Sequence, residues 1–185
     1  MQFALAPRLA RITFACAVVM IGAEARASLL DQLVTGPCVI GWEEPLIPAA
    51  DAASMMRFQV PMTVAAMMRA TATRLRESGI AVLLARSDEE VIRLAAQRSC
   101  PWLLTLTASG RGGTANLTVV VTLRQLPPSS EFHEGKDVRL GPPLFALARR
   151  HDPLPLMLNL EEEGKGFADA LIEAARAKRV PRREP

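Results

Sequence analysis

The sequence predicts one α/β domain, with a mixed sheet of about five strands and three helices in the order β-α-β-α-β-β-β-α. Three observations carry this prediction. The 185 residues are 50% hydrophobic and 22% charged, which is typical of a globular domain. Strand and helix patterns alternate in the first half of the chain, and three β-rich runs follow in the second half. Alternating units followed by a meander favour a mixed sheet with helices packed on it.

The first predicted strand covers 38–42 (CVIGW), and Pro45 and Pro48 follow it. The next element is an amphipathic helix from Pro61 to about Ser78. Apolar residues recur there at three- and four-residue intervals, at Val64, Met67, Met68, Ala72 and Leu75. Gly79 is expected to end the helix, because glycine is favoured just after the last helical turn.

Residues 80–85 (IAVLLA) are continuously apolar, which predicts a strand buried on both faces. Ser87 and Glu90 then form a capping-box pattern, in which the serine hydroxyl and the glutamate carboxylate bind exposed backbone N–H groups. This pattern predicts a helix that runs to about Arg98, with Pro101 preventing its continuation.

The last elements are a hairpin, a single strand and a closing helix. Residues 102–108 and 117–124 form the hairpin, and apolar side chains alternate along its second strand. A long polar connection over 125–143 leads to a strand at 144–148. The closing amphipathic helix is expected over 166–178, preceded by three glutamates.

The amino terminus has the pattern of a signal peptide. Arg8 and Arg11 precede a short apolar run, and Ala25-Arg26-Ala27 supplies the small-x-small pattern that signal peptidase recognises. We therefore predict cleavage near Ala27-Ser28, which divides the chain into a signal peptide (1–27), a periplasmic α/β domain (28–178) and a basic disordered tail (179–185). The apolar run is shorter than the roughly 20 residues of a membrane span, so no stable span is expected after cleavage.

Cysteine and charge content agree with export. Removal of the leader removes Cys16 and leaves Cys38 and Cys100, each just before a predicted strand, as an even pair. A disulfide between them is the favoured interpretation, and two separate buried thiols are the alternative. The whole chain has a formal charge of +3, and the leader carries three arginines and one glutamate, so the mature chain is close to neutral.

Three segments resemble those of a known group of periplasmic domains: RLRESGIAVLLA, RLAAQRSCPWLLTLTASG and ANLTVVVTLRQL. Over about 38–175 the chain resembles the small α/β domains of the TolB amino-terminal region, the CsgG family and the LpoB-type activators of cell-wall synthases. It differs from them at Ser99-Cys100-Pro101, where those families often carry Gly-Ala-Asp. The resemblance implies a non-catalytic domain that docks onto other envelope proteins.

The long connection over 125–143 is the candidate binding segment, because long loops in compact domains are often functional. Its candidate partner-binding residues are Glu131, Phe132, His133, Glu134, Lys136 and Asp137. We expect an accessory or protein-interaction module of the bacterial cell envelope. We expect no enzyme activity, bound metal, cofactor or nucleic-acid partner.

Two alternatives stay open from the sequence. The first is a small-ligand or copper binder that uses the same loop and the five methionines between residues 55 and 68, because thioethers bind copper(I). The second is a hydrolase built on His151 and Asp152, although the chain offers no serine in a G-x-S-x-G pattern.

Overall fold

The main sheet has the strand order β3-β2-β4-β5-β6 in the computed structural model, which describes residues 26–42, 56–110, 117–128, 140–151 and 159–181. Strand β2 (Val39–Trp42) is parallel to both of its neighbours, β3 (Val82–Ala85) and β4 (Trp102–Gly110). Strands β5 (Leu117–Gln125) and β6 (Phe145–His151) continue the sheet antiparallel. The predicted fold class, a mixed α/β domain, is confirmed, and the sheet has five strands as expected.

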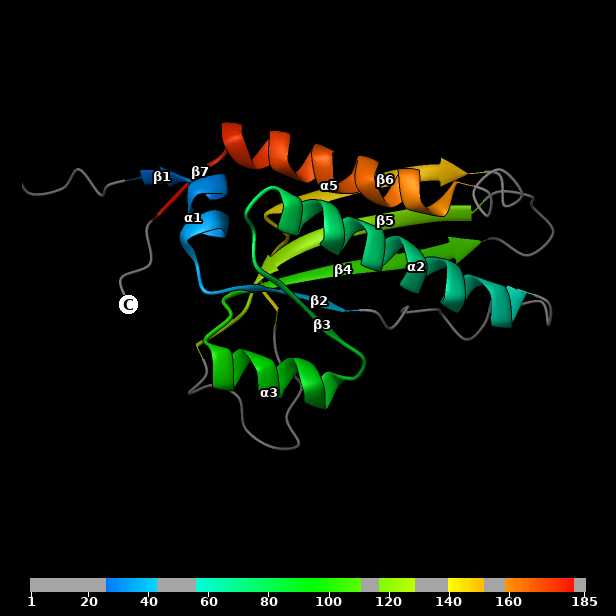
Figure 1. Ribbon diagram of the computed structural model, residues 1–185, viewed down its shortest axis with the longest axis horizontal. Helices are drawn as coiled ribbons and strands as arrows, with labels where there is room; N and C mark the ends of the chain where they lie inside the picture. The colour runs from blue at the N-terminus through cyan, green and yellow to red at the C-terminus, as the bar shows by residue number, and fades with distance from the viewer. Residues whose placement is uncertain (1–25, 43–55, 111–116, 129–139, 152–158, 182–185) are drawn as a thin grey trace, which may run out of the picture.

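The helices cover both faces of this sheet (Figure 1). Helices α2 (Met56–Glu77) and α5 (Leu160–Ala177) lie side by side on one face, and α3 (Asp88–Arg98) lies on the other. The topology explains this division. The crossover from β2 to β3 and the crossover from β3 back past β2 to β4 run in opposite directions along the sheet. Since both crossovers are expected to be right-handed, they place α2 and α3 on opposite faces.

Helices α2 and α5 approach each other closely at Gly164. A Cβ atom at this position would lie 2.6 Å from the Met67 backbone oxygen and 2.7 Å from the Ala70 Cβ. The Thr71 hydroxyl lies at the same crossing, 2.9 Å from the Gly164 carbonyl oxygen. Glycine is therefore the residue that allows the two helices to pack at this distance.

The main core lies between the sheet and the α2/α5 layer. Alternate residues of β5 point into it, and Val119, Val121 and Leu123 are fully buried, as the alternating pattern predicts. From α2, Met67, Met68 and Leu75 are also fully buried. A second cluster lies on the α3 side of the sheet and includes Val91 and Ala95 of that helix.

The predicted helix boundaries were partly wrong. Helix α2 begins at Met56 rather than at Pro61, and α5 begins at Leu160 rather than at Gly166, so the three glutamates expected before the last helix lie in its first turn. Carboxylates are stabilised there by the positive end of the helix. Gly79 follows α2 with φ +84°, as expected for a glycine that ends a helix.

Only one of the two hydrogen bonds of the predicted capping box at α3 forms. The Ser87 hydroxyl accepts the Glu90 N–H at 3.2 Å, as predicted. The Glu90 carboxylate, however, accepts the N–H of Arg86 at 2.9 Å, one residue earlier than the pattern implies. This hydrogen bond is the largest cause that lowers the pKa of Glu90.

A small second sheet and a short helix were not predicted. Strand β1 (Arg26–Ser28) pairs antiparallel with β7 (Arg179–Pro181), and α1 (Leu29–Thr35) follows β1 directly. Helix α1 has a complete capping box, in which the Ser28 hydroxyl accepts the Asp31 N–H and the Asp31 carboxylate accepts the Ser28 N–H. The β1/β7 sheet thus includes two residues assigned to the leader and three assigned to the tail.

Candidate functional site

The six candidate residues of the 125–143 loop, from Glu131 to Asp137, lie outside the described residues. The two ends of this loop are described. Leu126 follows β5 and Leu140 precedes β6, and these two strands are antiparallel neighbours. The loop therefore leaves the sheet and returns to it at the same end.

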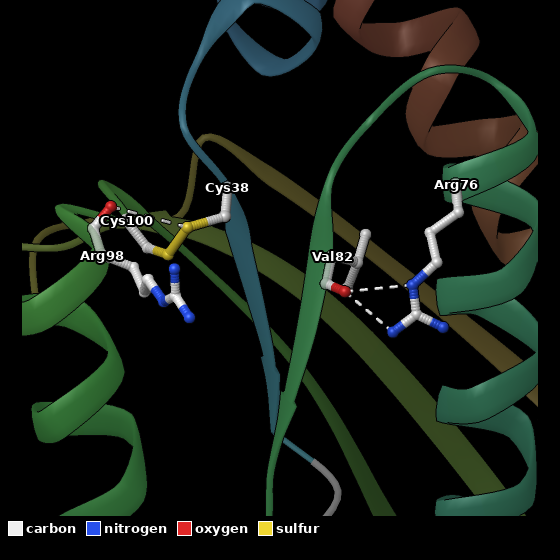
Figure 2. The surroundings of a disulfide bond; sticks show 5 residues. All are labelled: Cys38, Arg76, Val82, Arg98 and Cys100. Carbon is white, nitrogen blue, oxygen red and sulfur yellow. Dashed lines mark hydrogen bonds between the residues drawn. A yellow bond between two sulfur atoms is a disulfide. The ribbon is translucent and has the colours of Figure 1, made fainter.

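A disulfide bond joins Cys38 and Cys100 at this end of the sheet, as Figure 2 shows. Cys38 directly precedes β2 and Cys100 lies two residues before β4, and Val39 is paired with Trp102. Because parallel neighbours begin at the same edge of a sheet, the two cysteines meet with their Cα atoms 4.8 Å apart. Ser99, the C-cap residue of α3, has a left-handed backbone conformation with φ 52°. It turns the chain from the helix toward Cys100.

The surroundings of the disulfide are buried and mostly apolar. The exposed fractions of Cys38 and Cys100 are 4% and 3%. The Cys38 Sγ lies 3.8 Å from the Arg98 carbonyl oxygen. A bonded sulfur has no hydrogen to donate, so this is a packing contact. Both cysteines belong to the α3-side cluster, so the disulfide is packed among buried hydrophobic side chains.

Both ends of the candidate loop are attached to this same cluster. Leu126 is buried in it, and its N–H donates to the Pro101 carbonyl oxygen at 2.9 Å. Leu140 packs against the cluster, and the next residue, Gly141, accepts a 2.7 Å hydrogen bond from Arg124 Nη1 through its carbonyl oxygen. The disulfide-bonded cluster therefore holds the base of the loop.

The outer edge of β3 is closed by a side chain from α2. Arg76 donates from Nε at 3.0 Å and from Nη2 at 2.8 Å to the Val82 carbonyl oxygen (Figure 2). The neighbouring Ala81 carbonyl binds Val39 of β2, so the Val82 carbonyl points away from the sheet. Arg76 therefore occupies one of the carbonyl groups that an incoming strand would use at this edge.

The α3-side face of the sheet becomes more polar toward β6. Thr105 and Thr122 share a hydrogen bond between their hydroxyl oxygens at 2.7 Å. Beyond them the face carries half-buried Thr118 and Val120 and the exposed Arg150. This alternation of hydroxyl, apolar and cationic groups suits a surface that contacts solvent or a partner.

The second histidine, His151, lies at the end of β6 and faces α5. Its Nε2 is 3.9 Å from Glu163 Oε2, and Arg149 Nη1 is 3.3 Å from the same oxygen. The Arg149 guanidinium also lies 4.9 Å from the centre of the Phe167 ring. This cluster, which the sequence did not predict, joins β6 to α5 through an ion pair and a cation–π contact.

The hydrolase alternative has little support from this cluster. Its proposed second member, Asp152, lies outside the described residues. The described contacts of His151 are with Glu163 and Phe167, and Arg149 already neutralises the carboxylate of Glu163. The Nε2 atom of His151 is buried and has no hydrogen-bond partner among the described residues, so no nucleophile is bonded to it there.

The methionines of the copper alternative do not share one environment. Met67 and Met68 are fully buried in the main core, whereas Met62 is 75% exposed, so these three sulfurs do not converge. Among the described residues, no group of three histidine, cysteine or acidic side chains is arranged to hold a metal ion. Within the same residues, none of the helices is long and apolar enough to cross a membrane.

No family model matches the chain, and no curated protein matches its sequence. The fold is similar to that of the PelC dodecamer from Paraburkholderia phytofirmans, at 16% identity and a TM-score of 0.43, over 77% of this chain and 89% of that chain. It is also similar to the LpoB C-terminal domain from Salmonella enterica, at 10% identity and a TM-score of 0.29, over 67% of this chain and 93% of that chain. Both similarities are at the level of the fold.

Proposed function

We propose that this protein is an exported accessory module of the bacterial cell envelope, which acts by binding another envelope protein and not by catalysis. The observation that carries the proposal is the buried disulfide whose cluster holds both ends of the 125–143 loop. Disulfides persist in oxidising compartments such as the periplasm and are rare in the reducing cytosol. The signal-peptide pattern at the amino terminus points to the same compartment.

The loop is the proposed partner-binding segment. Its residues Phe132 and His133 offer an aromatic anchor and a polar ring, and Lys136 and Asp137 offer charges of both signs. Interfaces gain most of their binding energy from a few such anchors surrounded by polar groups. A base held by the disulfide cluster and by the Arg124 hydrogen bond reduces the ordering cost of the loop on binding.

The test uses site-specific photocrosslinking in the envelope of the source organism. A photoreactive residue is placed at Phe132 or Lys136, and as matched controls at the exposed positions Glu173 of α5 and Arg93 of α3. We expect one dominant adduct with an envelope protein from the loop positions and none from the controls. The adduct should disappear when residues 129–139 are replaced by a short glycine-serine connection, in a variant that still forms the disulfide.

Two results would contradict the proposal. The first is an equal pattern of adducts from loop and control positions, which would show that the loop has no specific partner. The second is full biological function of the shortened variant in cells, with its disulfide and its circular dichroism spectrum unchanged, because function would then not need the loop.

A further inference from the structure

The β1/β7 sheet makes the first described residues part of the fold. Arg26 is paired with Pro181, Ala27 with Val180 and Ser28 with Arg179. The ladder continues into the domain, since the Leu29 N–H donates to the Lys178 carbonyl oxygen at 2.8 Å.

Helix α1 also holds β7 in place. Gln32 Nε2 donates to the Val180 carbonyl oxygen at 3.2 Å, and Val180 belongs to the main core with an exposed fraction of 7%. Strand β1 therefore pairs with a strand whose middle residue is buried, directly after the carboxyl end of α5.

The sequence contains two overlapping small-x-small patterns at the end of the leader. Ala25-Arg26-Ala27 directs cleavage before Ser28, and Ala23-Glu24-Ala25 directs it before Arg26. Cleavage before Ser28 would remove two of the three residues of β1 and the partner of Val180. It would also place a new ammonium group on Ser28, the N-cap residue of α1, where the positive end of the helix disfavours a cation.

We infer that the leader is removed between Ala25 and Arg26, so that the mature chain begins with an intact β1. This inference rests on the proposed export of the protein. In the cleavage step, a signal peptidase of the envelope adds water across the Ala25–Arg26 amide bond, which leaves a carboxylate on Ala25 and an ammonium group on Arg26. The chain then folds with all three pairs of the β1/β7 ladder.

The test is the intact mass of the protein purified from the periplasmic extract of a bacterial host that expresses the full chain. The expected major species spans residues 26–185. A major species of residues 28–185 would overturn the inference and leave the proposed export standing. An unprocessed chain that stays in the cytoplasm would overturn the proposed export itself.

Two variants, one on each side of the proposed cleavage position, identify it independently of later trimming. Ala23→Leu alters the recognition residue of the proposed site alone, and we expect it to stop cleavage before Arg26. Ala27→Leu alters only the other site, and we expect it to be processed like the wild type. The opposite pattern, with Ala27→Leu unprocessed and Ala23→Leu processed normally, would overturn the inference. The Ala23 variant does not change any residue of the mature chain, so a folding defect does not confuse its result.

Discussion

Removal of the Cys38–Cys100 bond is expected to lower the free energy of unfolding by about 4 kcal/mol. The two cysteines are 62 residues apart in the sequence, and a cross-link over a loop of this length removes much of the conformational entropy of the unfolded chain. The perturbation is the double variant Cys38→Ala/Cys100→Ala. Both positions are almost fully buried, and alanine leaves no unpaired hydroxyl group there.

Urea denaturation, followed by circular dichroism, measures this effect. With a denaturant slope of about 2 kcal/mol per molar urea, a loss of about 4 kcal/mol lowers the unfolding midpoint by about 2 M. The wild type kept reduced by excess reductant should unfold near the double variant, and reductant should not change the midpoint of the double variant. Unfolding of the oxidised protein, the reduced protein and the double variant at the same urea concentration would show that the disulfide does not stabilise the fold.

Gly164→Ala should lower the free energy of unfolding by about 1 to 3 kcal/mol, because the new Cβ would meet the backbone of α2. The control is Gly141→Ala, which should unfold like the wild type because a Cβ there would have no atom within 4 Å. Equal urea midpoints for the two variants would contradict this prediction. Hydrogen bonds from Ser28 lower the pKa of Asp31 in the folded state, so its contribution to stability is complete above the unfolded pKa and is lost as the pH falls. In the Asp31→Asn variant, the free energy of unfolding should therefore decrease less steeply below about pH 5 than in the wild type. Parallel plots of unfolding free energy against pH for the two proteins would exclude this role of Asp31. Arg76→Ala should expose the edge of β3 and increase concentration-dependent self-association in light scattering, and a variant as monodisperse as the wild type would show that Arg76 does not protect this edge.

Much of the fold could be predicted because its signals are local. Alternation along β5 places Val119, Val121 and Leu123 on one face of a strand whatever the strand packs against. A glycine at position 79 supplies the positive φ that ends α2, and Ser87 caps α3 through a hydrogen bond to a residue three positions away. These effects depend on backbone geometry within a few residues, so they can be identified in the sequence.

The elements that the sequence did not reveal depend on distant partners. Strand β1 has only three residues and exists because β7, more than 150 residues later, pairs with it. The same holds for the Arg149–Glu163 ion pair, which forms because β6 and α5 pack together. No local pattern marks either feature, since each partner alone resembles an ordinary polar or terminal segment.

The residue types of the candidate site can be identified in the sequence: an even pair of cysteines and a long polar loop that leaves one strand and enters another. Their proximity follows from strand pairing. The parallel pairing of β2 with β4 brings Cys38 to Cys100, and the antiparallel pairing of β5 with β6 brings Leu126 and Leu140 to the same cluster. The reason is physical: side-chain periodicity is a property of a segment, whereas strand order depends on which hydrophobic faces the whole chain can bury at once.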